Sequence, residues 1–136
     1  MSTSGYSGTP LLNKLGIKPL MKVLLVNRPD DYYELLEMDI SKQLTKKNAV
    51  PDFIHLFVKN EKEFETEMKK LKPLIQQNKE VIIWVSWYKK AAKIPTDVTE
   101  DTVRNYALKN ELVDIKVCAV SDIWSGLKLV VPKALR

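Results

Sequence analysis

The segment WVSWYKKAAKIPTDVTED, residues 84–101, holds the best candidates for chemistry in the chain. Ser86 is a possible nucleophile, and the possible acid–base groups are Lys89, Lys90 and Asp97. A serine nucleophile needs a histidine base within reach. The only histidine, His55, lies in the middle of the apolar run FIHLFV. That position favours a hydrogen-bonded core histidine, so Ser–His catalysis is the weaker interpretation.

The same segment is also the best candidate for a ligand site. It follows a predicted buried strand, and open α/β sheets bind ligands at the carboxyl ends of their strands. Its adjacent lysines would attract a phosphate or carboxylate, although the acids that follow would partly neutralise them. The C-terminal hairpin should bring a third tryptophan to the same place, with aromatic walls beside polar groups. The predicted ligand site comprises Trp87, Tyr88, Lys89, Lys90, Thr96, Asp97, Trp124, Ser125, Gly126 and Lys128.

A purely structural interpretation competes with this site. Trp84 and Trp87 are three residues apart in a predicted strand, so they point to opposite faces and cannot stack on one ligand. At least one of them belongs to the core. In this interpretation Trp124 closes the edge of the core, and the lysines point to solvent.

A weaker anion-binding candidate is GYSGTP, which precedes a predicted helix whose first N–H groups would face an anion. The residues concerned are Gly5, Ser7, Gly8 and Thr9. The alternative is a terminal segment that ends in a helix cap. Cys118 alternates with Lys116 and Val120 in a predicted strand, which favours core packing over a reactive thiol.

Composition indicates the class of protein. A length of 136 residues favours one domain over residues 1–136, with residues 1–9 as a flexible or covering segment. One cysteine fits a reducing compartment, and one cysteine with one histidine cannot form the usual zinc sites. No apolar run reaches the length of a membrane helix. We therefore expect a soluble, cytoplasmic protein without a metal site or membrane contact.

The net charge of +5 raises the possibility of nucleic-acid binding. The lysines are scattered, however, and those of EKEFETEMKKLK follow the acids of the same segment. That order complements a helix macrodipole, so a solvated helix face explains the lysines. Nucleic-acid binding requires a basic stripe and remains the weakest hypothesis.

Apolar runs and helical patterns alternate along the first two thirds of the chain. Thr9 should cap a short helix with Pro10 at its first position and Gly16 at its end. Unbroken apolar runs predict strands at 21–27, 53–58 and 81–87, and residues 38–51 read as a loop with room for one helical turn.

Further helices should follow the second and third strands. Asn60, with Glu63, should begin the longest helix, in which Phe64, Met68, Leu71 and Ile75 share one face. Pro73 should end or kink that helix. Other predicted caps are Asp30 and Thr99 or Thr96, and a hairpin is predicted from DIKVCAV, SDIWSG and LKLVVP.

Four segments resemble Rossmann-type methyltransferases: LGIKPLMKVLLVN, DFIHLFV, LKPLIQQNKEVIIWVSW and LVDIKVCAVSDIWSGLKLVV. The resemblance implies a truncated, three-layer α/β Rossmann-like domain. Its sheet has about five strands, mostly parallel with a C-terminal antiparallel hairpin, in the order 1-2-3-5-4. The first strand then lies at an edge of the sheet. A cover is expected from the N-terminal segment, from residues 38–51, or from a second copy in a homodimer.

In those methyltransferases the first strand ends in a glycine-rich loop that cradles S-adenosylmethionine. Here Asn27-Arg28-Pro29-Asp30 stands in that place, and its bulky side chains prevent close backbone approach. S-adenosylmethionine is therefore not expected in the usual mode, and no other cofactor is predicted.

The chain also resembles, over nearly its whole length, a family of small bacterial proteins of unknown function. The shared motifs are GYSGTPL, KLGIK, PTDVTED, KVCAV and WSGLKL. Tyr88 departs from the proline that is more usual at its position, and no catalytic assignment comes with the motifs.

Three functional hypotheses follow. The first is a non-catalytic, methyltransferase-like module that binds a small anionic ligand or a protein partner. The second is a transferase-like enzyme with unassigned chemistry at the carboxyl ends of the strands, and the third is nucleic-acid binding. Because the sequence lacks a glycine loop and an evident nucleophile–base pair, the first is favoured.

Overall fold

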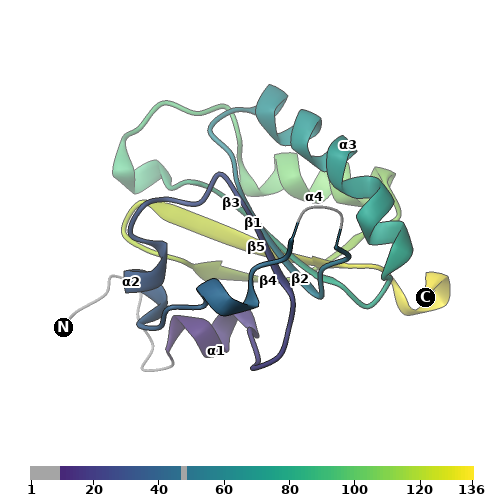
Figure 1. Ribbon diagram of the computed structural model, residues 1–136. Coiled ribbons are helices and arrows are strands. Elements are labelled where there is room, and N and C mark those ends of the chain that lie inside the picture. Colours follow the sequence, from purple (N-terminus) through teal and green to yellow (C-terminus); the bar gives the residue numbers. More distant parts are fainter. Residues whose placement is uncertain (1–9, 47–48) are drawn as a thin grey trace.

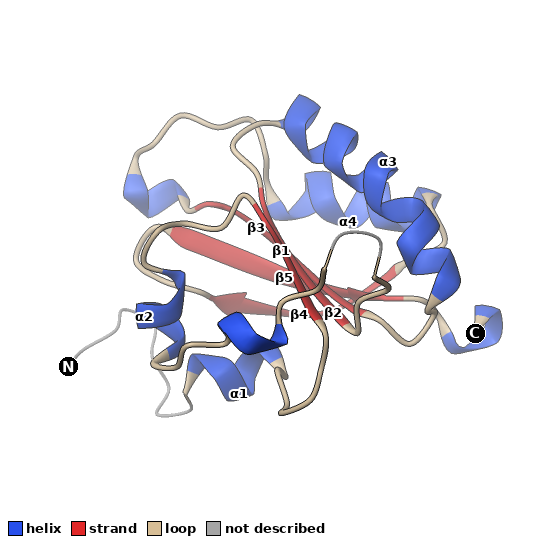
Figure 2. Ribbon diagram, viewed as in Figure 1, coloured by secondary structure: helices blue, strands red, loops and turns tan. Residues whose placement is uncertain are grey.

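The computed structural model describes residues 10–46 and 49–136. Five strands form one sheet in the order β1-β2-β3-β5-β4, which confirms the predicted fold (Figures 1 and 2). The first three strands are mutually parallel, and β5 is antiparallel to both β3 and β4. The strands are β1 (Val23–Val26), β2 (Phe53–Phe57), β3 (Ile82–Tyr88), β4 (Val113–Ala119) and β5 (Trp124–Val130).

Helices cover both faces of the sheet. In Figure 1, α3 and α4 lie above it and α1 and α2 lie below it. The α-helices are α1 (Leu11–Leu15), α2 (Tyr32–Leu36), α3 (Glu61–Gln77) and α4 (Glu100–Lys109). Single 3₁₀ turns occur at Ser41–Gln43, Lys90–Ala92 and Lys133–Leu135, the first of them inside the predicted loop 38–51.

The caps of α3 and α4 explain where these helices begin. The side chain of Asn60 accepts a hydrogen bond from the Glu63 N–H at 2.8 Å, as predicted. Thr99, rather than Thr96, caps α4 through a reciprocal pair of bonds with Thr102. Pro73 does not end α3, which continues to Gln77 because the buried residues on its inner face extend to Ile75.

The two short helices begin differently from the prediction. Pro10 has ψ 144° and lies outside α1, which starts at Leu11 and ends at Leu15, with Gly16 as its C-cap at φ 85°. The predicted Thr9 cap falls outside the described residues. In α2 the first turn is closed by the backbone, because the Tyr32 N–H donates to the Pro29 carbonyl at 3.1 Å. Asp31 occupies the cap position without a side-chain bond, so the Asp30 cap was wrong.

The sheet separates two apolar layers. The layer beneath α3 and α4 contains Phe64, Met68, Leu71 and Ile75, the predicted helix face. Trp87 belongs to this layer, whereas Trp84 belongs to the layer on the α1 and α2 side. The two tryptophans therefore point to opposite faces, as their spacing predicted, and both are buried.

Strand β1 lies at one edge of the sheet and β4 at the other. The β1 edge is partly covered from within the predicted segment 38–51. There the Thr45 N–H donates to the Val23 carbonyl at 2.8 Å, and Leu44 forms an isolated parallel bridge with Val23. The edge position of the first strand is thus confirmed.

Candidate functional site

The carboxyl end of β3 meets the start of β5. Tyr88 and Trp124 are direct cross-strand partners, and their rings stack with centroids 4.4 Å apart and planes inclined by 22°. The Lys89 N–H donates to the Ile123 carbonyl at 2.8 Å. Trp124 therefore approaches the segment 86–97 as the hairpin prediction required. It is almost completely buried, so it offers little surface to a ligand.

The remaining predicted ligand residues do not all gather there. The Thr96 hydroxyl donates to the Lys59 carbonyl at 2.8 Å, and the Asp97 carboxylate accepts from the Glu61 N–H at 2.7 Å. Asp97 therefore places a negative charge at the positive N-terminus of α3. Both side chains fasten the loop after β3 to the start of that helix. Trp87 lies in the core on the same side, and Lys90 is exposed in a 3₁₀ turn.

Gly126 has a packing role on the α1 side of β5. A Cβ atom added there would lie 3.1 Å from Val120 Cγ2, 3.2 Å from Trp84 Cε3 and 3.3 Å from Ser86 Oγ. These neighbours are themselves buried and have little room to move. The absence of a side chain at position 126 thus allows the hairpin to close over Trp84.

We expect Gly126→Ala to lower the free energy of unfolding by about 1–3 kcal/mol, the usual cost of overpacking. Denaturant unfolding measures the change. Ser125→Ala is the matched control at the neighbouring, half-buried position and should stay within about 0.5 kcal/mol of the wild type. Equal stabilities for the two variants would show that the neighbours of Gly126 yield freely.

Four lysines lie near Cys118 of the hairpin, and we call Lys14, Lys89, Lys116 and Lys128 the lysine face. Lys116 on β4 and Lys128 on β5 are direct cross-strand partners, and the next pair along this face is Cys118 with Gly126. Lys14 comes from the last turn of α1, and Lys89 directly follows β3.

The electrostatics of the lysine face reflect this crowding. Burial raises the pKa of the Cys118 thiol, while the positive charges of Lys14, Lys116 and Lys89 oppose that rise. Burial lowers the pKa of Lys128, and Lys116 lowers it further. None of the ion pairs between described residues involves Lys89, Lys116 or Lys128.

Sequence reasoning included Lys89 and Lys128 but missed Lys14 and Lys116. The signal for Lys116 was available in the alternation of Lys116 with Cys118, which puts both on one face of β4. Finding its partner also required the register of the hairpin.

A buried polar chain crosses the layer between the sheet and α2. The Tyr32 hydroxyl lies 2.8 Å from His55 Nδ1, and His55 Nε2 lies 2.7 Å from the Ser86 Oγ. All three residues are completely buried, and burial lowers the pKa of His55 to about 3. Ser86 and His55 thus do meet, but inside the core, where substrate has no access.

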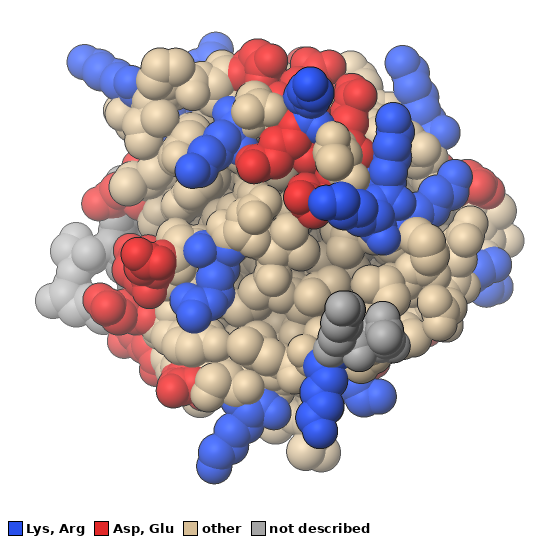
Figure 3. Space-filling model, turned by 45° about the horizontal axis from the view of Figure 1, so that its top comes forward, with Lys and Arg blue, Asp and Glu red and all other residues tan. Residues whose placement is uncertain are grey.

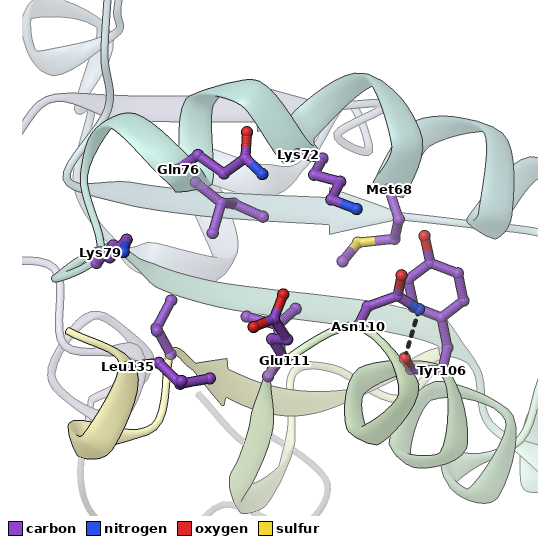
Figure 4. Close-up of a pocket in the computed structure, with 11 residues that line it drawn as sticks. Met68, Lys72, Gln76, Lys79, Tyr106, Asn110, Glu111 and Leu135 are labelled. Carbon is purple, nitrogen blue, oxygen red and sulfur yellow. Dashed lines mark hydrogen bonds between the residues drawn. The ribbon is translucent and has the colours of Figure 1, made fainter.

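Two surface cavities lie away from the stacked rings. The first, of about 130 Å³, opens between the C-terminal halves of α3 and α4 (Figure 4). Its wall combines apolar residues such as Met68 with Lys72, Lys79 and Glu111, and the Asn110 side chain there donates to the Tyr106 carbonyl at 2.8 Å. The second, of about 340 Å³, lies beside β1 and includes Leu24, Lys46 and Lys70.

Several other features bear on the class of site. Within residues 10–46 and 49–136, no three His, Cys, Asp or Glu side chains are grouped to hold a metal ion. No helix in the described part of the chain is long and apolar enough to cross a membrane.

The anion candidate Gly5, Ser7, Gly8 and Thr9 falls outside the described residues. In the view of Figure 3, described acidic and basic side chains are interspersed without a continuous basic stripe.

Comparison with known proteins supports the fold alone. No protein-family model matches the sequence, and no curated protein matches it significantly. A Streptococcus agalactiae protein described as belonging to the NADB-Rossmann superfamily aligns with a TM-score of 0.56 at 10% identity, over 93% of this chain and 69% of that one. An uncharacterised Listeria monocytogenes protein aligns with a TM-score of 0.58 at 8% identity, over 92% of this chain and 68% of that one. The chain therefore has a Rossmann-like fold.

Proposed function

We propose that the protein is a non-catalytic Rossmann-like module that binds an anionic ligand through the lysine face. The observation that carries the proposal is the direct opposition of Lys116 and Lys128 on neighbouring strands. Like charges in that arrangement destabilise a sheet. An anion bound between the two ammonium groups would remove the repulsion.

Protection of the sheet edge does not account for both lysines. A lysine on an edge strand discourages unwanted strand pairing, and this explains Lys116 on β4. Lys128 lies on β5, between β3 and β4, where both sides of the strand are already paired. It is also half-buried opposite Trp84, so its charge is partly desolvated. A bound anion would compensate the partly desolvated charge of Lys128.

The carboxyl ends of the strands give less support to catalysis. The one histidine and Ser86 are completely buried, and the Asp97 carboxylate is bonded to the start of α3. At the end of β1, the Asn27 side chain donates to the Phe57 carbonyl at 3.3 Å. Arg28 lies over the Tyr33 ring at 4.7 Å. These contacts support a module that does not take S-adenosylmethionine in the usual mode.

Binding of inorganic tripolyphosphate tests the proposal. We expect saturable binding by calorimetry and a loss of about tenfold or more in affinity for Lys116→Gln and for Lys128→Gln, since one charge-assisted hydrogen bond contributes about 1.5–3 kcal/mol. Lys128→Arg should retain most of the affinity because it keeps the charge.

Lys62→Gln is the matched control, because Lys62 is exposed on α3, on the other side of the sheet. The proposal would be overturned if the wild-type protein did not bind tripolyphosphate, or if all three Gln variants lost the same amount of affinity for it. A tighter, strongly salt-dependent interaction with a short DNA duplex would replace it with nucleic-acid binding.

A further inference from the structure

Strand β4 is an edge strand whose outer side is unpaired among the described residues. It pairs with β5 on one side, and no described residue outside these two strands hydrogen-bonds to its backbone. The Val120 N–H donates to the Trp124 carbonyl, and bonded pairs alternate along an antiparallel ladder. The backbone N–H and C=O groups of Lys116 and Cys118 therefore face β5. Those of Val117 lie on the other side of β4, in the plane of the sheet, and point away from β5.

The two faces of this edge differ chemically. Val117 is the partner of Leu127, which belongs to the layer beneath α3 and α4, so its side chain lies on that face. It is nevertheless 50% exposed, and Ile115 is 52% exposed. Lys116 and Cys118 lie on the opposite face, with Lys128. A strand added beside the second half of β4 would find the apolar side chain of Val117 on one face and the ammonium group of Lys116 on the other.

We propose that β4 binds an extended acidic peptide as an additional strand of the sheet, with acidic and apolar residues alternating along the peptide. Its acidic side chains would lie on the lysine face, and an apolar side chain would lie against Val117. Side chains of a strand alternate between faces, so this pattern matches both surfaces at once. Main-chain hydrogen bonds provide affinity in such complexes, and side-chain contacts provide specificity. This inference rests on the proposed function, because it names the carrier of the anion.

Charge favours such a peptide over a second copy of the chain. The strand itself carries one acid, Asp114, whose carboxylate is already bonded to Arg104 at 3.0 Å. Two copies paired through β4 would bring two lysine faces together, and each chain has a net charge of +5. The register shift between Asp114 and Lys116 limits regular pairing of any added strand, peptide or second copy, to the second half of β4.

The test uses a short synthetic peptide that alternates glutamate and valine, with fluorescence anisotropy as the readout. We expect it to bind the whole protein, to compete with tripolyphosphate, and to slow hydrogen exchange of the Val117 amide. Methylation of alternate peptide nitrogens, on the edge facing β4, should weaken binding by about tenfold or more, since it removes main-chain donors without changing charge. The matched control peptide carries the methyl groups on the other edge.

The outcomes separate this inference from the proposed function. If tripolyphosphate binds and Lys128→Gln weakens it, but the peptide does not compete, the lysine face binds anions and strand addition is wrong. Equal binding of both methylated peptides would likewise show acid capture without strand addition. If neither probe binds, both proposals fail. Dimerisation of the protein alone, lost on Val117→Pro, would assign the edge to a second copy instead.

Discussion

Replacing Trp84 with alanine is expected to lower the free energy of unfolding by about 3–5 kcal/mol, the range for a large buried aromatic residue. Trp84 is completely buried in the centre of the layer on the α1 side. Its Nε1–H also donates to the Leu15 carbonyl at 2.8 Å. The substitution therefore leaves a cavity in the core and releases the C-terminal end of α1 from the sheet.

Trp84→Phe separates these two contributions. It keeps most of the apolar volume but removes the donor, so a smaller loss of about 1–3 kcal/mol is expected from the unpaired carbonyl and the residual gap. Denaturant unfolding at neutral pH measures both variants. A loss below about 1 kcal/mol for the alanine variant would contradict the described packing, because such values are typical of sites without a buried anchor.

Much of the architecture could be predicted because its signals are local. The runs around β2 and β3 are continuous and apolar since both faces of these strands are covered, and the spacing of Phe64, Met68, Leu71 and Ile75 fits a helix. The order of the strands came from the methyltransferase resemblance instead. Periodicity alone does not determine which strand lies beside β3.

Helix termini were less predictable where the backbone, rather than a side chain, closes the first turn. Asn60 and Thr99 make their cap bonds through their own oxygens, so residue type pointed to Asn60 and narrowed the cap of α4 to Thr99 or Thr96. In α2 the Pro29 carbonyl accepts the first bond, and a carbonyl is present at every position of the chain. No residue-type signal distinguishes that start.

The candidate site was only partly visible for a related reason. The approach of Trp124 to Tyr88 followed from the predicted strand order, which puts the last strand of the hairpin beside the third strand. The hydrogen bonds of Thr96 and Asp97 join them to residues 37 and 36 positions away in the sequence, and no local sequence pattern predicts these bonds. The lysine face depends on the hairpin register, where a slip of one residue would move Lys116 to the other face.

The second large effect is a loss of folding stability at acidic pH that depends on the buried His55. Its pKa is lowered to about 3 by complete burial, from 6.5 for an accessible histidine. Between these two values the unfolded chain holds a proton that the folded protein excludes. The stability that depends on neutral His55 is therefore fully present above pH 6.5 and is lost progressively as the pH falls toward 3. The loss approaches about 1.4 kcal/mol per pH unit within this window.

Denaturant unfolding of the wild type and of His55→Gln across this pH range isolates the effect. The 17 acidic residues titrate in both proteins, so their contribution cancels in the difference. At neutral pH we expect the wild type to be more stable, because His55 bridges Tyr32 and Ser86 with both ring nitrogens. That advantage should shrink as the pH falls and then reverse, since glutamine cannot be protonated.

Parallel stability curves for the two proteins would mean that water reaches the imidazole and that protonation of His55 carries no penalty. The same result would reopen the serine hypothesis, because a hydrated His55 within 2.7 Å of Ser86 could act as its base. If the stability curves of the wild type and of His55→Gln converge as the pH falls, His55 is a neutral histidine. Both of its hydrogen bonds are then made inside the core. In that case Ser86 has no base accessible to a substrate, and the acid titration bears directly on whether this Rossmann-like domain is a binding module.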